Sequence, residues 1–230
     1  MKITWLTQAG LLFDTGRAKI MVDPYLSDSC MSLSPDKHRR IPVKEEIFNV
    51  CPDIILITHD HLDHLDPETL DKFLIGAEHP ITVIASENAY FKVREYGGAH
   101  NYVLLAPHSV FSEKGITIYS VKAEHSDRCA VGFILDDANK TYYVSGDTLY
   151  NYDVIDDVLS LVETGVDYAF LPINGVGNNM NAKDAADFAY EIGAKIAIPL
   201  HYGLFDSLDP AEFDFEDAMT LEPFVETELK

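Results

Sequence analysis

The segment His59-Asp60-His61-Leu62-Asp63-His64 places four potential metal ligands, three imidazoles and the Asp63 carboxylate, within six residues. It directly follows the apolar run 53–58, which the pattern predicts to be a buried strand. Protonated imidazoles would repel one another, and every buried ring nitrogen needs a partner. A divalent cation meets both requirements. The segment therefore predicts a metal site, with Asp60 supporting the ligands from outside.

Three further segments that look like buried strands also end in a residue of metal-binding type. They end in His125, in Gly146-Asp147 and in His201. A single histidine at a strand end is more often structural than a ligand. Ligands from several strand ends can, however, converge on one edge of a sheet, the usual place for an active site in layered α/β folds. Together with the first segment they predict one metal centre.

This order of ligands resembles the metallo-β-lactamase superfamily over nearly the whole chain. Four further segments resemble the small bacterial branch that includes L-ascorbate-6-phosphate lactonase: 20–25, 145–148, 171–175 and 199–203. From the residues alone the fold class is mixed α/β. The resemblance implies the four-layer αββα sandwich of that superfamily, formed as a single domain over residues 1–230.

The resemblance also implies the role of each ligand. It assigns His59, His61 and His125 to a first metal, Asp63, His64 and His201 to a second, and Asp147 to a position between them. A water or hydroxide held between the metals would be the nucleophile, and Asp63 and Asp147 would be the catalytic carboxylates. Nitrogen and oxygen ligands do not separate the metals, so Zn²⁺ is the first expectation and Mn²⁺ the alternative.

Composition is that of a compact enzyme. The chain has 230 residues, 47% of them hydrophobic, and a formal net charge of -21. That charge disfavours nucleic acid and anionic membranes as partners. Three cysteines without CxxC spacing indicate reduced thiols. We read no signal peptide and no membrane span, and therefore expect a cytoplasmic protein with a small-molecule substrate. The sequence leaves a homo-oligomer open.

Periodicity predicts strands first and then alternating strands and helices. Strands are expected at 3–7, 11–14, 19–22, 81–85, 116–121, 131–135, 141–144, 167–171 and 195–200. Helices are expected at 67–74, from Ser86 to Gly97, at 153–162 and at 182–192. Residues 27–50 form a polar excursion, and the tail 205–230 is expected to end in a packed helix.

Four residues are candidates for substrate contact. Arg39 and Arg40 lie in the polar excursion, where a guanidinium could hold a phosphate or carboxylate, although a solvated loop is equally consistent with the sequence. Asn174 follows a strand in a Gly/Asn-rich turn. Tyr202 follows His201 and could donate to an oxyanion, or could be a core tyrosine.

The function expected from these residues and the resemblance is dinuclear metal-dependent hydrolysis of a small, soluble, anionic metabolite. Lactone or ester hydrolysis is the first hypothesis, and phosphodiester hydrolysis is the alternative. A di-iron redox protein is a third alternative.

Overall fold

The computed structural model describes residues 1–162 and 164–230. The chain divides into two compact units. Unit 1 comprises Met1–Leu104, Gly203–Ser207 and Leu221–Lys230, and unit 2 comprises Leu105–Tyr202 and Leu208–Thr220. A single domain over 1–230 stays a prediction. The mixed α/β class is confirmed, because each unit contains one sheet and at least two α-helices.

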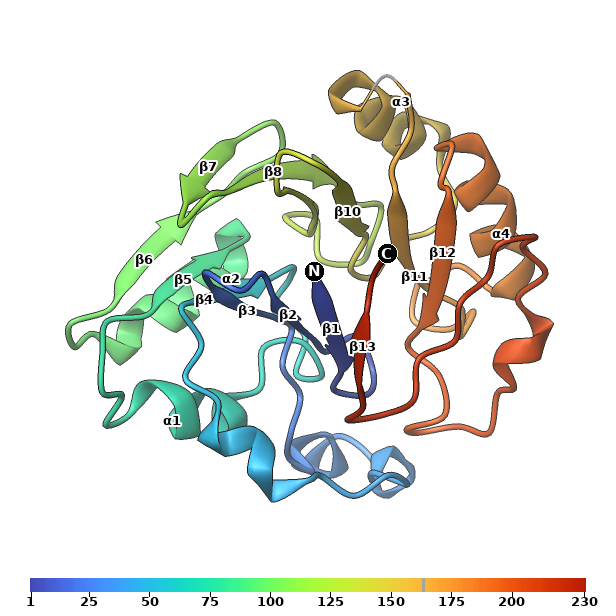
Figure 1. Ribbon diagram of the computed structural model, residues 1–230. Helices are drawn as coiled ribbons and strands as arrows, with labels where there is room; N and C mark the ends of the chain where they lie inside the picture. Colours follow the sequence, from blue (N-terminus) through green and yellow to red (C-terminus); the bar gives the residue numbers. More distant parts are fainter. Residues whose placement is uncertain (163) are drawn as a thin grey trace. The chain divides into compact units, whose positions relative to one another are not determined.

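Unit 1 contains a seven-stranded sheet (Figure 1). In spatial order its strands are β13 (Glu226–Glu228), β1 (Lys2–Trp5), β2 (Leu11–Asp14), β3 (Lys19–Val22), β4 (Ile54–Ile57), β5 (Thr82–Ala85) and β6 (Asn101–Leu104). Strand β2 is antiparallel to both β1 and β3, and β3 is parallel to β4. The carboxyl ends of β1, β3 and β4 therefore meet at one edge of this sheet.

Helices α1 (Pro67–Leu74) and α2 (Glu87–Val93) belong to the same unit. Helix α1 begins as the sequence predicts, because the Asp66 side chain accepts a hydrogen bond from the Glu68 N–H and Pro67 occupies the first turn. Its buried Leu70, Phe73 and Leu74 join a hydrophobic cluster with Ile55 and Ile57 of β4. This packing of α1 against β4 fixes the position of the segment that connects them.

Unit 2 contains a six-stranded sheet with helices α3 (Tyr152–Leu161) and α4 (Ala182–Glu191). Its strands in spatial order are β12 (Ile196–Leu200), β11 (Tyr168–Pro172), β10 (Thr141–Val144), β9 (Val131–Asp136), β8 (Ile116–Lys122) and β7 (Val110–Glu113). Strands β10, β11 and β12 are parallel, and β9 is antiparallel to β8 and β10. Strands β8, β10, β11 and β12 therefore end at one edge.

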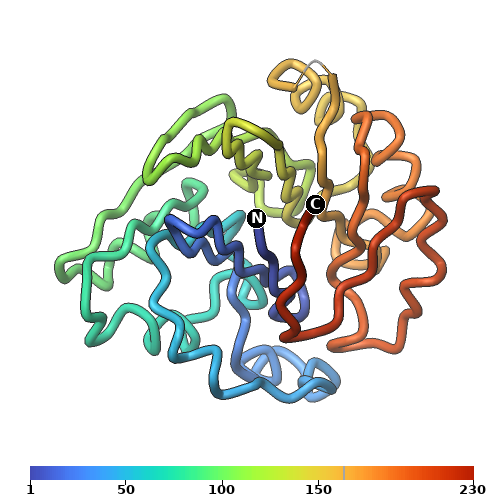
Figure 2. The backbone as a smooth tube through the Cα atoms, in the orientation of Figure 1, coloured from blue at the N-terminus to red at the C-terminus, as the bar shows by residue number. Residues whose placement is uncertain are grey.

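The structure differs from the sequence-based prediction at the tail and contains two further strands that were not predicted. The expected terminal helix is wrong: after a short 3-10 turn at Pro210–Glu212, the chain ends in β13, which pairs with β1. Figure 2 shows the two ends of the chain side by side along this pair. Pro210 and Pro223 interrupt any long helix there. Strands β6 and β7 lie at sheet edges, where weak alternation hides them.

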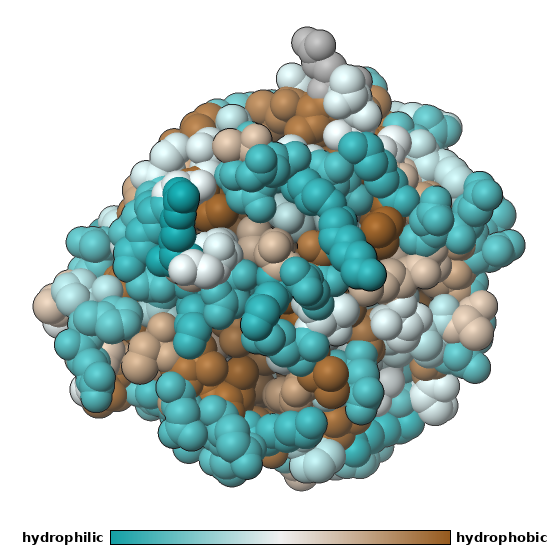
Figure 3. Space-filling model, viewed as in Figure 1, coloured by the Kyte–Doolittle hydropathy of each residue, from teal (hydrophilic) through white to brown (hydrophobic). Residues whose placement is uncertain are grey.

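No helix among the described residues is long and apolar enough to span a bilayer. The face of the molecule in Figure 3 is mostly hydrophilic, with hydrophobic side chains scattered between polar ones. The polar excursion contains three short 3-10 helices, Ser29–Ser32, Pro35–Lys37 and Glu45–Asn49, all within unit 1.

Candidate metal centre

The His-rich segment forms a tight turn directly after β4 in unit 1. The backbone N–H groups of His64 and Leu65 both donate to the His61 carbonyl, at 3.0 and 2.7 Å. His59 and His64 are fully buried, and ligand-type atoms of Asp23, His59 and His64 all lie within 4.8 Å of one another. The turn therefore gathers imidazoles at the edge of the sheet where β4 ends.

Asp23 and Thr58 set the ring nitrogens of His59 and His64. Asp23 follows β3, and its carboxylate accepts from the Thr58 N–H at 2.8 Å, the Thr58 hydroxyl at 2.5 Å and Nδ1 of His64 at 2.7 Å. Since the Thr58 hydroxyl donates to Asp23, it accepts from Nδ1 of His59, 3.0 Å away. Both rings then carry their proton on Nδ1 and present an Nε2 lone pair, which is the state a metal needs.

His59 and His61 face each other with the separation of two ligands on one ion. Nε2 of His59 and Nδ1 of His61 are 3.0 Å apart. Two imidazole nitrogens bound tetrahedrally to Zn²⁺ would be about 3.3 Å apart, given bonds of roughly 2.0–2.1 Å. These donors fit a metal by number, type and spacing.

Asp63 and Asp60 play different parts within the same turn. The Asp63 carboxylate accepts a hydrogen bond from Nε2 of Gln8 at 2.8 Å, and the same oxygen lies 4.0 Å from Nε2 of His64. Asp60 instead pairs with Lys92 of α2, with Oδ2 and Nζ 2.7 Å apart. Asp63 is therefore oriented beside the imidazoles, while Asp60 ties the turn to the neighbouring helix.

In unit 2 the Asp147 carboxylate lies between two imidazoles. Its Oδ1 is 3.4 Å from Nε2 of His201, and its Oδ2 is 4.0 Å from Nε2 of His125. His201 follows β12, His125 follows β8 and Asp147 follows β10. The carboxyl ends of these three strands share one edge. With one oxygen toward each ring, the carboxylate is placed so that it could bridge two ions.

The loop after β11 contacts both of these rings at their Nδ1 atoms. Nδ1 of His125 donates to the Asn178 carbonyl at 3.2 Å, and the Asn174 side-chain amide lies 2.9 Å from Nδ1 of His201. Asn178 has a left-handed backbone, with φ of 66°. The structure thus places Asn174 against a proposed ligand.

The remaining candidates separate into buried and exposed groups. Tyr202 is buried, and burial together with the Asp209 carboxylate raises its pKa to about 12. The Arg39 guanidinium donates to the Tyr25 carbonyl, the Ile41 carbonyl and the Thr7 hydroxyl. Arg40 is exposed and lines a groove of about 510 Å³, together with Arg39, Asp28, Glu45, Glu68 and Lys72. Arg39 is therefore used as an internal link, and Arg40 faces solvent.

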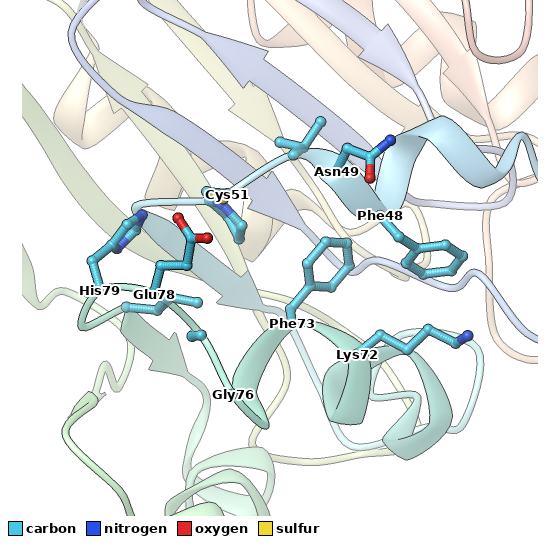
Figure 4. Close-up of a pocket in the computed structure, with 12 residues that line it drawn as sticks. Phe48, Asn49, Cys51, Lys72, Phe73, Gly76, Glu78 and His79 are labelled. Carbon is cyan, nitrogen blue, oxygen red and sulfur yellow. The ribbon is translucent and has the colours of Figure 1, made fainter.

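Figure 4 shows a separate cavity of about 310 Å³ in unit 1, beside α1. Phe48, Cys51, Lys72, Glu78 and His79 are among its lining residues. Nδ1 of His79 lies 3.1 Å from the Pro80 carbonyl. None of the seven proposed ligands lines this cavity, so it is distinct from the candidate metal centre.

Sequence reasoning missed Gln8 and Thr58 as supporting residues and gave Asp23 no role. Asp23 carries a signal in hindsight, because an acid directly follows a buried strand there, as Asp147 follows β10. Thr58 immediately precedes His59, and only the parallel pairing of Val22 with Leu56 shows that Asp23 faces it. Gln8 lies in the turn between β1 and β2, where no sequence pattern marks it.

Comparison with known proteins agrees with this geometry. The family model described as the beta-lactamase superfamily domain matches residues 18–202. The chain is 28% identical over 219 residues to a UPF0173 metal-dependent hydrolase of Pyrobaculum arsenaticum, covering 93% of this chain and 90% of the relative. It is 30% identical over 222 residues to a UPF0173 metal-dependent hydrolase of Thermoplasma volcanium, covering 93% and 89%.

A solved structure shows the same fold. It is Igni18, a metallo hydrolase from Ignicoccus hospitalis, with a TM-score of 0.77 and 20% identity, covering 100% of this chain and 99% of that one. The expected superfamily and its metallo-β-lactamase fold are thereby confirmed, while the narrower kinship with lactonases stays a prediction. The chain belongs to the beta-lactamase superfamily, among its metal-dependent hydrolases.

Proposed function

We propose that this hydrolase binds two divalent ions and uses them to hydrolyse a lactone or ester of a small anionic metabolite. The observation that carries the proposal is the Asp147 carboxylate, with one oxygen directed at His201 and the other at His125. A carboxylate can bridge two ions by giving one oxygen to each. We propose His59, His61 and His125 for one ion, and Asp63, His64 and His201 for the other, on the resemblance already described.

Bound divalent ions would lower the pKa of a water ligand to about 7 and polarise the bond under attack. The chain's own residues would orient that chemistry. Asp63, held by Gln8, would align the attacking water and accept its proton. Tyr202 keeps its proton at neutral pH, since its pKa is raised to about 12, so it would donate a hydrogen bond to the developing oxyanion.

The donor set favours Zn²⁺, with Mn²⁺ as the alternative. All seven proposed ligands are imidazoles or carboxylates. Imidazole-rich sites suit Zn²⁺, whereas carboxylate-rich sites suit Mn²⁺. Because five of the seven proposed ligands are imidazoles, Zn²⁺ is the first metal to test.

The substrate anion would be held by Arg40. Both arginines line the groove, but three of the hydrogen-bond donor groups of Arg39 are used by protein oxygens, whereas Arg40 is exposed. Because a chain of net charge -21 repels anions, a local cation would help to hold an anionic substrate. The same proposed centre could attack phosphorus, so phosphodiesters belong in the test.

The test is metal analysis followed by a substrate panel. The protein would be purified without added metal, its ions counted by elemental analysis, and its activity measured after reconstitution with Zn²⁺ or Mn²⁺. The panel would pair anionic and neutral lactones, esters, thioesters and phosphodiesters. Asp63→Asn should abolish turnover, while Asp60→Asn, a matched change in the same turn, should retain most of it. Fewer than two ions per chain, or equal loss in both variants, would overturn the proposal.

A further inference from the structure

The connection between β1 and β2 has an unusual backbone. Thr7 and Gln8 are consecutive non-glycine residues with left-handed φ angles of 75° and 50°. Such angles are uncommon outside glycine and are a genuine outlier for a β-branched residue such as threonine. Both side chains are buried, with Thr7 0% and Gln8 2% exposed. A sequence of glycine and asparagine would form this turn with less strain, so the surroundings must impose it.

Several contacts hold the turn in this conformation. The Arg39 guanidinium donates to the Thr7 hydroxyl at 2.8 Å. The indole N–H of Trp5 donates to the Gln8 carbonyl at 3.0 Å. The Gly10 N–H donates to the Thr7 carbonyl at 2.8 Å. Arg39 also binds the Tyr25 carbonyl, so it ties the turn to the segment that follows β3.

This backbone conformation directs the Gln8 side chain at Asp63. Nε2 of Gln8 donates to Oδ2 of Asp63 at 2.8 Å. Strands β1 and β4 end at the same edge of the sheet. The turn after β1 therefore lies on the same side as the segment after β4, which contains Asp63. Backbone strain of this kind is commonly retained where it positions a functional group.

We propose that Gln8 is a positioning residue for the second metal, presented by the strained Thr7-Gln8 turn and acting through Asp63. The inference rests on the proposed function, in which Asp63 is a ligand. An amide donor on one carboxylate oxygen fixes the orientation of the carboxylate beside the imidazoles, and so would hold it ready for an ion. A neutral donor also leaves the carboxylate its full negative charge.

The fit of Gln8 to this task is specific in length and in charge. Asparagine is one methylene shorter, so its amide would fall short of Asp63 by about the length of a carbon–carbon bond, roughly 1.5 Å. Methionine matches the length of glutamine and carries no N–H. The two substitutions remove the same hydrogen bond in different ways.

The experiment measures metal affinity, separately from turnover. Apo-protein would be titrated with Zn²⁺ against a chromophoric chelator, for wild type, Gln8→Met and Gln8→Asn. The matched control is Tyr102→Phe, which removes a hydrogen bond of 2.8 Å to the Gly97 carbonyl, elsewhere in unit 1. We expect both Gln8 variants to bind the first ion normally and the second about 10- to 100-fold more weakly. Tyr102→Phe should match wild type.

Thermal unfolding of the apo-proteins separates positioning from folding. Asparagine tolerates left-handed φ better than glutamine, so Gln8→Asn should fold at least as stably as wild type while losing affinity for the second ion. A merely structural role would move stability and affinity in the same direction. With Co²⁺ in place of Zn²⁺, the visible absorption of the second equivalent should shift in both variants.

Two outcomes would overturn this inference. If wild type binds two ions and both Gln8 variants bind them within twofold of wild-type affinity, the inference fails and the proposed function stands. If wild type binds fewer than two ions, the proposed function fails and takes this inference with it. Should Gln8→Met not fold, Gln8→Asn alone decides, because it keeps a polar amide in the turn.

Discussion

The proposed ligands of unit 1 are neighbours in sequence, whereas those of unit 2 come from three separate strand ends. His59, His61, Asp63 and His64 lie in one six-residue turn. His125, Asp147 and His201 follow β8, β10 and β12. A turn can gather ligands by local geometry alone. The second set comes together only once the sheet has formed, so its geometry depends on strand register.

The residues that orient these proposed ligands show the opposite pattern in the two units. Unit 1 orients its ligands with side chains from other strands: Asp23 after β3, and Gln8 after β1. Unit 2 orients His125 and His201 from one loop, through the Asn178 carbonyl and the Asn174 amide. Local ligands thus have distant supports, and distant ligands have a local support. The comparison predicts which substitutions act on one ligand and which act on two.

The largest effect should come from Asp147→Asn, since Asp147 faces both rings of unit 2. The amide keeps the volume but removes the charge and replaces one metal-binding oxygen with NH₂. We expect kcat/KM to fall by about 10³-fold or more, equivalent to ~4 kcal/mol of the barrier, with loss of at least one ion. Steady-state kinetics and elemental analysis measure the two effects. Full metal content together with near-normal turnover would remove Asp147 from the bridging position.

Asp23→Asn should come next, because Asp23 accepts three hydrogen bonds. The amide has a single oxygen and cannot accept from the Thr58 N–H, the Thr58 hydroxyl and His64 Nδ1 with the same geometry. Supporting partners of ligating histidines are typically worth about 10- to 100-fold in metal affinity or activity. Chelator competition would measure the loss.

The natural control for Asp23→Asn is Asp53→Asn. Asp53 also lies between β3 and β4, and it accepts from the Lys19 N–H at the opposite end of β3. We expect Asp53→Asn to change stability without changing metal affinity. Equal changes in metal affinity for both variants would mean that Asp23 acts only by stabilising the sheet.

The success of prediction from sequence follows the same division between local and distant residues. The strands Leu11–Asp14 and Lys19–Val22 and the helix Pro67–Leu74 have the bounds that the sequence predicts, because alternation, turn residues and an Asp-Pro helix start are local signals. The seven proposed ligands, which stay a prediction, were identified by residue type and order. Gln8, Thr58 and the tail strand β13 were not, because their roles depend on which strands become neighbours.

A third prediction compares two asparagines of the loop after β11. Asn174→Ala removes the amide beside His201 and should lower metal affinity about tenfold, the small end of the range for such partners. Asn178→Gly should have little effect, because Asn178 acts through its carbonyl and glycine adopts its φ of 66° readily. Metal titration of both variants measures the difference. Equal effects would show that the loop acts as a whole.

A fourth prediction concerns stability. Arg39→Met removes three hydrogen bonds and a guanidinium 5.4 Å from the Tyr25 ring centroid. Burying the freed acceptors should cost about 1–3 kcal/mol, which lowers Tm by about 2–4 °C for each kcal/mol in a chain of this size. Calorimetry of the apo-protein measures it. An unchanged Tm would contradict the role of Arg39 as an internal link.

The smallest effect should come from Arg40→Ala, and it separates the two adjacent arginines by function. Arg40 is exposed at its groove, so its loss should leave Tm and metal content unchanged. An exposed charge pair is worth about 1 kcal/mol or less, so KM for an anionic substrate should rise at most about fivefold, with kcat and the KM of a neutral analogue unchanged. Arg17→Ala, which removes the same charge at the exposed turn between β2 and β3, is the control for net charge. A selective rise in Arg40→Ala would assign anion binding to this groove. Equal rises in both variants would attribute the effect to overall charge, and no rise would leave the polar excursion without a part in substrate binding.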